Sequence, residues 1–239
     1  MPAALDRLAR QIVACRRCPR LLAWAQDVVQ HKRPAFAAQA YWGHPVSGFG
    51  DPAARVLLVG LAPAAHGALR TGRLFTGDRS GDFLFAALHR AGFANQPVSR
   101  DRSDGLRLRG AWLTAALRCA PPANRPLPLE LANCLPYLER ELELLPRVRV
   151  IVALGAIAHR QTLRALALPA AHCRFAHAAE CAAGRYRLLA SYHPSQQNTF
   201  TRRLTPAMLD AVLARARAVA RLPAPPRARR SLPSHLALS

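Results

Sequence analysis

The segment RVLLVGLAP, residues 55–63, has the composition of a β-strand that is buried on both faces. Four apolar residues follow Arg55 without interruption, and a glycine and a proline then end the run. Continuous apolar runs of this kind are typical of parallel strands, because helices cover both faces of a parallel sheet. Three further runs share the pattern: AWLTAALRC (111–119), RVRVIVALG (147–155) and RYRLLASYHP (185–194).

Helical patterns lie between and after these apolar runs. The predicted helices are 80–92, 128–145, 156–166 and 205–222. In the first of them, Ser80 is placed to cap the start and Gly92 to end the helix. The alternation of strands and helices predicts an α/β fold, in which helices flank a mainly parallel sheet on both faces.

The charge of the chain is strongly positive. Its 239 residues include 34 lysines and arginines against 13 aspartates and glutamates, which gives a formal net charge of +21 and a pI near 11.6. Such an excess favours a polyanionic partner, and we expect that partner to be nucleic acid. Each basic side chain that neutralises a phosphate releases a condensed counterion, which favours binding. We expect residues 1–222 to form one domain and the Pro/Arg-rich tail, 223–239, to be disordered.

Three polar loops follow strands of the predicted sheet. They are GLAPAAHG (60–67), CAPPANRP (119–126) and HPSQQNTFTRRL (193–204). The carboxyl ends of parallel strands meet at one edge of a sheet, and ligands bind there. The three loops are therefore predicted to form the walls of one site.

The cysteines suggest a metal centre without deciding which one. Cys15 and Cys18 form a C-x-x-C motif, Cys119 follows a predicted strand, and Cys134 comes fifteen residues later. Zinc and a [4Fe–4S] cluster both accept four thiolates, and buried cysteines without any metal are a third interpretation. A disulfide framework is disfavoured in a cytosolic chain, so Cys173 and Cys181 are ordinary residues in this interpretation.

Five motifs occur in a fixed order along the chain. They are YWGHPVSGFGDP (41–52), VLLVGLAPAAHG (56–67), RTGRLFTGDRSGDFLFAALHRAGF (70–93), LTAALRCAPPANRP (113–126) and HPSQQNTFTRRLT (193–205). Together with the cysteine pattern, they resemble the family 5, or type B, uracil-DNA glycosylases. A match of five ordered motifs is far more specific than any one of them.

The resemblance implies a fold, a cofactor and an activity. It implies a single α/β domain with a central four-stranded parallel sheet, and a [4Fe–4S] cluster on Cys15, Cys18, Cys119 and Cys134. It further implies that uracil and other deaminated bases are flipped out of double-stranded DNA and released by hydrolysis of the N-glycosidic bond, leaving an abasic site. Two residues depart from the family's pattern, since Leu69 stands where asparagine is expected and Arg202 where glycine is expected.

The resemblance also assigns residues to the flipped base. Phe75 corresponds to the aromatic side chain that stacks on the base, although a core phenylalanine would look the same in sequence. Asn124 can present its amide to the base edge, although asparagine is commoner as a turn residue in such loops. His193 can donate a hydrogen bond to the base O2 as negative charge develops there.

The catalytic acid is expected outside the first polar loop. That loop offers Ala62, Ala64 and His66 to the substrate and contains no carboxylate. Asp82 lies in the first turn of a predicted helix, where a carboxylate already favours the helix dipole. Asp78 precedes that helix, and the resemblance assigns it the essential acidic position.

The last polar loop is expected to contact DNA. Ser195 and its neighbours can bond phosphates, while Arg202 and Arg203 supply positive charge. A non-catalytic DNA-binding module with a structural metal cluster is the main alternative. A nucleotide hydrolase is disfavoured, because Lys32 is the only lysine and lies outside any phosphate-binding loop. No run of 18 apolar residues and no secretory signal is present, so we expect a cytoplasmic, nucleoid-associated bacterial monomer.

Overall fold

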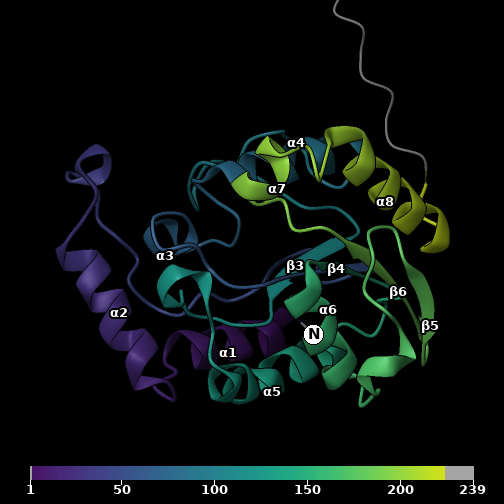
Figure 1. The fold of residues 1–239 in the computed structure, drawn as a ribbon, viewed down its shortest axis with the longest axis horizontal. Coiled ribbons are helices and arrows are strands. Elements are labelled where there is room, and N and C mark those ends of the chain that lie inside the picture. The colour runs from purple at the N-terminus through teal and green to yellow at the C-terminus, as the bar shows by residue number, and fades with distance from the viewer. Residues whose placement is uncertain (1, 224–239) are drawn as a thin grey trace, which may run out of the picture.

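The computed structural model describes residues 2–223, and its centre is a six-stranded sheet in the order β1-β3-β2-β4-β6-β5 (Figure 1). Four central strands are parallel: β2 (Val56–Gly60), β3 (Ala111–Ala115), β4 (Val150–Leu154) and β6 (Tyr186–Ser191). The predicted parallel core is confirmed. Two short edge strands, β1 (Phe49–Gly50) and β5 (Glu180–Ala183), run antiparallel to their neighbours and were not predicted.

Eight α-helices surround this sheet within the described residues. They are α1 (Pro2–Val13), α2 (Pro19–Gln30), α3 (Ala68–Thr71), α4 (Arg79–Arg90), α5 (Pro128–Leu144), α6 (Ala156–Ala165), α7 (Gln196–Phe200) and α8 (Pro206–Val219), with 3₁₀ turns at Pro34–Phe36, Pro122–Asn124 and Ala170–His172. In Figure 1, α4 and α8 lie on one face of the sheet and α1, α5 and α6 on the other. This arrangement gives the three layers that the sequence predicts.

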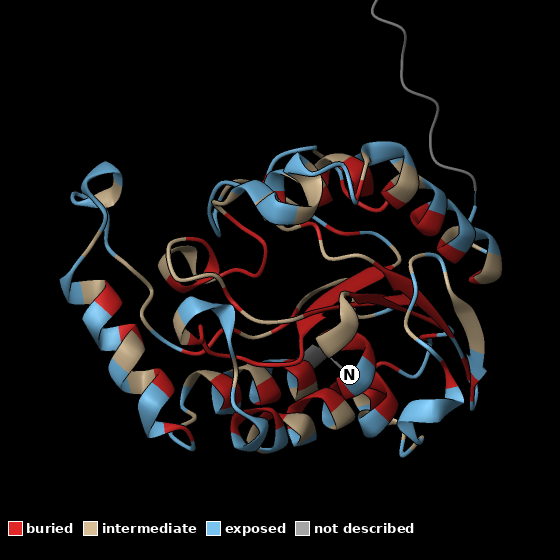
Figure 2. Cartoon of the chain, in the orientation of Figure 1, coloured by how far each residue is buried: buried red, intermediate tan, exposed pale blue. Residues whose placement is uncertain are grey.

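Strand β2 shows how the core divides between the two faces. Its alternate residues Val56 and Leu58 pack with side chains of α4 and α8, whereas Leu57 and Val59 pack with side chains of α5 and α6. All four are fully buried, and the strands form the buried centre of Figure 2. Side chains of a strand point alternately to opposite faces, so a strand between two helical layers must be apolar throughout.

The start of helix α4 differs from the prediction. Asp78, not Ser80, is the N-cap, and its Oδ1 accepts a hydrogen bond of 2.9 Å from the Gly81 backbone N–H. Both residue types are good caps, and the sequence alone did not separate them. The start of α8 is as predicted, because the Thr205 hydroxyl caps the helix and a proline occupies its first position.

The interpretation of Cys173 and Cys181 as ordinary residues was wrong. They form a disulfide with a Cα–Cα distance of 6.2 Å, which joins the segment after the last 3₁₀ turn to β5. Their spacing of eight residues carries no motif, and the neighbouring His172 ring is hydrogen-bonded to the Ala182 carbonyl of β5, which holds the two segments together. The tail predicted to be disordered lies, apart from its first residue, outside the described residues. No helix within residues 2–223 is long and apolar enough to cross a membrane.

Candidate active site

Phe75 and His193 come together above the carboxyl ends of the central strands. Their ring centroids are 5.8 Å apart and the ring planes differ by 30°. Phe75 lies against Gly60, the last residue of β2, where an added Cβ would be 2.6 Å from the phenyl Cε2. His193 lies against Gly155, directly after β4, where an added Cβ would be 3.2 Å from the histidine Cβ. The two aromatic residues thus sit where the backbone leaves room for them.

The backbone of Phe75 is held in an unusual conformation. Its φ is +52°, a left-handed value that is uncommon for a bulky residue and costs free energy. Gly81 in the first turn of α4 makes this possible, because a Cβ there would lie only 1.9 Å from the Phe75 carbonyl oxygen. Phe75 as a whole is 7% exposed. Phe75 is the one aromatic residue with a left-handed φ among the described residues, and the contact of its carbonyl with Gly81 holds it there.

His193 is a neutral hydrogen-bond donor in this environment. Burial lowers the pKa of its imidazole to about 4, so the ring carries no charge near neutral pH. The Asn198 side chain donates to the His193 carbonyl oxygen at 2.9 Å and fixes the backbone of the loop. A neutral imidazole retains one N–H, which can donate to an oxygen that gains negative charge.

Asp78 joins two of the predicted motifs. Besides capping α4, its carboxylate packs on the loop after β2, since an added Cβ at Gly67 would lie 2.0 Å from Oδ2. Burial raises the pKa of Asp78, and hydrogen bonds from the backbone of Gly81 and Ser80 partly oppose that rise. The sequence analysis gave the start of α4 to Ser80 as cap and to Asp82 through the helix dipole, whereas Asp78 is the cap in the structure. A buried carboxylate whose pKa is raised is a candidate for acid–base chemistry.

The residues of the first polar loop are engaged with the protein. The His66 Nδ1 lies 3.0 Å from the Tyr41 hydroxyl, and burial lowers the pKa of its imidazole. The Ala64 carbonyl accepts hydrogen bonds from the backbone N–H groups of Gly67 and Leu69. Ala62 packs against the cluster that contains the cysteines. These residues shape the loop, and Phe75 and His193 are the aromatic pair beside it.

Asn124 and Ser195 lie in the segments that follow β3 and β6, and their contact with a substrate stays a prediction. Asn124 is exposed, has a left-handed φ of +56°, and forms no side-chain hydrogen bond with another described residue. The Ser195 hydroxyl caps α7 by accepting from the Asn198 backbone N–H at 3.3 Å. Asn124 ends the 3₁₀ turn that follows β3, and Ser195 lies between β6 and α7.

Four free cysteines converge from separate segments. Cys15 follows α1, Cys18 precedes α2, Cys119 follows β3, and Cys134 lies in α5. They share one apolar cluster. Burial raises the pKa of Cys134 to about 11 and that of Cys119 further, and the other thiols of the set add to both shifts.

This donor set suits a thiolate-ligated metal centre, because a bound metal supplies the positive charge that buried thiolates need. Within residues 2–223, no three His, Cys, Asp or Glu side chains are gathered tightly enough to hold a metal ion. The fit of these cysteines to a metal centre therefore rests on three buried thiols, the partly buried Cys15 thiol and their mutual electrostatic influence.

Comparison with known proteins identifies the family. The sequence model described as "Uracil DNA glycosylase superfamily" matches residues 47–217, which is most of the chain. The chain belongs to the uracil-DNA glycosylase superfamily. The family expected from the motifs is thereby confirmed.

Three relatives in this superfamily carry the name "Type-5 uracil-DNA glycosylase". The protein of Mycobacterium leprae is 53% identical over 221 residues, covering 91% of this chain and 96% of its own. That of Thermus thermophilus is 53% identical over 222 residues, covering 91% and 100%. That of Pyrobaculum aerophilum is 46% identical over 213 residues, covering 89% and 92%. The likeness extends over nearly the whole length of all three.

The two departures from the glycosylase family's pattern have different physical settings. Leu69 is 1% exposed and packs with Ala25, Val28 and Ala120, so an apolar side chain suits its position. Arg202 is exposed and has a left-handed φ of +55°, the region in which glycine is favoured. The first departure is accommodated by packing, whereas the second leaves a strained backbone.

Sequence reasoning missed the glycines that shape the site in this superfamily member. Gly60, Gly155, Gly67 and Gly81 each leave room for a neighbour that a Cβ would crowd. Gly60 and Gly155 stand at strand ends, where glycine commonly marks a close approach, and Gly67 and Gly81 stand at the starts of α3 and α4. The position of these glycines beside predicted strand ends and helix starts was the signal in the sequence that could have identified them.

Proposed function

We propose that this protein is a monofunctional uracil-DNA glycosylase that removes uracil, and other deaminated bases, from double-stranded DNA. The relatives of this chain are named for uracil-DNA glycosylase activity, and they match nearly its full length. The observation that carries the proposal is the Phe75–His193 pair at the carboxyl edge of the sheet. A flat aromatic ring beside a neutral hydrogen-bond donor is what a flipped base requires.

Base excision on this site follows from the chemistry of bond cleavage. As the N-glycosidic bond lengthens, the sugar becomes positive and the uracil becomes negative at O2. Phe75 stacks on the base and His193 donates its N–H to the developing oxyanion. Asp78 supplies a carboxylate that stabilises the sugar cation or accepts a proton from the attacking water. Asn124 and Ser195 reach the base edge and the DNA backbone from the rim when DNA is bound.

The four cysteines are proposed to hold a [4Fe–4S] cluster. Cys15, Cys18, Cys119 and Cys134 would ligate it, and the proposal is supported by their position in one apolar cluster, in which Cys15 alone is partly exposed. When bound, the cluster supplies a covalent cross-link between segments far apart in sequence. This chain's own residues then hold α1 and α2 against the end of β3 and against α5.

Metal content tests the cluster separately from the activity. Purified protein is expected to be brown, with broad absorption near roughly 400 nm from thiolate-bound iron. Elemental analysis should give iron and sulfide rather than zinc. Colourless, zinc-replete and fully active protein would show that the cluster assignment is wrong.

Release of free uracil tests the proposed function. Protein is incubated with a uracil–guanine duplex in a chelator of magnesium, and the free base is measured by chromatography. The matched control is the same duplex with thymine in place of uracil. Release from the uracil duplex only is expected. Tight binding of uracil DNA with no base released would instead support a non-catalytic DNA-binding module.

The physical setting of the enzyme follows from its charge and substrate. The chain contains 34 lysines and arginines against 13 aspartates and glutamates, and this positive charge suits double-stranded DNA as the partner. We infer that the protein acts as a monomer on chromosomal DNA inside the cell, with the loop from His193 to Leu204 against the duplex. Sedimentation with and without DNA would detect a dimer.

A further inference from the structure

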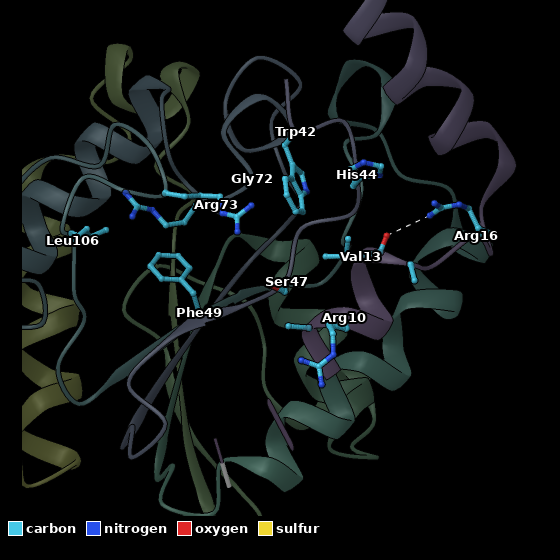
Figure 3. A pocket seen from close by; sticks show the side chains of 13 residues that line it. Arg10, Val13, Arg16, Trp42, His44, Ser47, Phe49, Gly72, Arg73 and Leu106 are labelled. Carbon is cyan, nitrogen blue, oxygen red and sulfur yellow. Dashed lines mark hydrogen bonds between the residues drawn. The ribbon is translucent and has the colours of Figure 1, made fainter. Parts of the chain in front are cut away.

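A cavity of about 750 Å³ lies apart from the Phe75–His193 pair, along the β1 edge of the sheet (Figure 3). Helix α1 forms one wall, the segment from Trp42 to Phe49 a second, and the loops around Arg73 and Arg102 a third. Neither Phe75, Asp78 nor His193 lines it. The proposed glycosylase chemistry therefore leaves this cavity unexplained.

The walls of the cavity combine aromatic surface with positive charge. Trp42 and Phe49 border it together with Arg10, Arg16, Arg73 and Arg102, and no acidic side chain lines it. Arg73 is paired with Asp104 at 2.6 Å. The other three arginines form no ion pair with any described residue. Three uncompensated guanidinium groups around one cavity favour an anionic ligand.

Trp42 is held so that its ring is a wall of the cavity. Its indole Nε1 already donates to the Pro45 carbonyl at 3.2 Å, so the polar atom of the ring is satisfied. The Arg102 guanidinium lies over the ring at 4.4 Å from its centroid. Gly72 lets both side chains approach, since an added Cβ would be 2.9 Å from each. Figure 3 shows Trp42 and Phe49 on one side of the opening and Arg10 and Arg16 on the other.

We propose that this cavity binds a nucleotide, with the base against Trp42 and Phe49 and the phosphate at Arg10 and Arg16. A nucleobase matches flat aromatic walls, and a phosphate matches guanidinium donors. The volume lies within the range of small-molecule sites, about 300–1,000 Å³. The nucleotide comes either from solution or from a strand of DNA, and its chemistry at the site is the same.

The test uses the full-length protein as purified and two pairs of variants. Arg10→Glu and Arg102→Ala change cavity walls on different elements. The matched controls are Arg7→Glu and Arg107→Ala. Arg7 is on the same helix as Arg10, Arg107 is exposed and close in sequence to Arg102, and neither residue lines the cavity. Arg10→Glu and Arg7→Glu change the net charge by the same amount, as do Arg102→Ala and Arg107→Ala. The long-range attraction of anions is therefore equal within each pair.

Deoxyadenosine 5′-monophosphate, inorganic phosphate and a single-stranded oligo-deoxyadenylate are titrated by calorimetry and tryptophan fluorescence. Arg10→Glu and Arg102→Ala are expected to raise the mononucleotide Kd about tenfold or more, and the matched controls less than about twofold. Phosphate alone should bind at least about tenfold more weakly than the mononucleotide, because it cannot use the aromatic walls.

The titrations with the mononucleotide and with the oligonucleotide distinguish the source of the nucleotide. Saturable binding of the mononucleotide shows that a free nucleotide suffices. If only the oligonucleotide loses affinity in the cavity variants, the nucleotide belongs to a DNA strand. The proposal is overturned if neither ligand binds in an Arg10-dependent way, if the matched controls lose as much affinity, or if phosphate binds as tightly as the mononucleotide. These binding readouts do not depend on base excision.

Discussion

At the residue scale, the Asp78 carboxylate serves the fold and the proposed chemistry at once. Capping α4 uses Oδ1, while Oδ2 lies against Gly67 in the loop after β2. Burial opposes its ionisation and raises its pKa. Removing the charge without removing the cap separates the two roles, because asparagine caps helices about as well as aspartate.

Asp78→Asn is therefore expected to keep the fold, the metal centre and DNA binding, and to lose none of its free energy of unfolding. Excision of uracil should fall by roughly 10²–10⁴-fold, the range for loss of a positioned acid–base group. Single-turnover rates on a uracil–guanine duplex measure this. Asp82→Asn removes the same charge within the first turn of α4 and should slow excision far less. Near-native rates for Asp78→Asn, or a larger defect for Asp82→Asn, would overturn the assignment.

His193 predicts how stability responds to acid. Its pKa is about 4 when folded, against 6.5 for free histidine, so the unfolded chain binds the proton first. The contribution of neutral His193 to the free energy of unfolding is complete above pH 6.5. It is lost as the pH falls towards 4. His193→Gln should lose less stability than wild type between pH 7 and 4.5 in urea unfolding. Equal losses in the two proteins would show that the histidine is not buried in its neutral form.

At the element scale, the strands were predictable because burial on both faces leaves an unbroken apolar run. Strands β2 and β4 follow from that pattern alone, whereas β3 contains Thr114 and β6 the exposed Arg187 within otherwise buried runs. Strand β1 has two residues, and β5 has intermediate or exposed positions, so neither carries the signal. The start of α4 was missed by two residues, since Asp78 and Ser80 are both good caps and only the packing against Gly67 selects one. The disulfide was missed because tertiary pairing alone creates it.

The short segment after α7 carries a strain that glycine would relieve. Arg202 has φ +55°, where a side chain costs about 1 kcal/mol relative to glycine. Arg202→Gly is expected to raise the free energy of unfolding by up to about 1 kcal/mol, measured by chemical denaturation. Arg203→Gly removes the same charge but also the contact of that guanidinium with the Tyr192 ring at 4.7 Å, and it should destabilise. A loss of stability in both variants would contradict the strain at Arg202.

At the scale of the whole molecule, the charge and the parallel core were evident in the sequence, whereas the strand order was not and the site was only partly so. Phe75 and His193 meet because two different strands end beside each other, and a motif cannot show that contact. Asn124 and Ser195 match motifs as well, and their contact with a substrate stays a prediction. A motif identifies residue types, and the sheet decides which of them face one another.

The excess of positive charge predicts a steep dependence of DNA binding on salt. Outside the last 17 residues the formal charge is still +18, because the tail contains three arginines and no acid. Neutralising several phosphates should lower affinity by about 10²–10³-fold between roughly 50 and 200 mM salt, measured by fluorescence anisotropy. Deleting residues 223–239 should weaken non-specific binding only modestly. Affinity that does not change with salt would refute the electrostatic account.

The central claim is that a base is excised between Phe75 and His193 at the carboxyl edge of the sheet. The most direct measurement is single-turnover release of uracil by His193→Gln, with His177→Gln as the matched control for loss of a half-buried imidazole nearby. The account predicts a rate about 10²–10³-fold below wild type for His193→Gln, with DNA affinity retained, and a near-native rate for His177→Gln. A near-native rate for His193→Gln would contradict it.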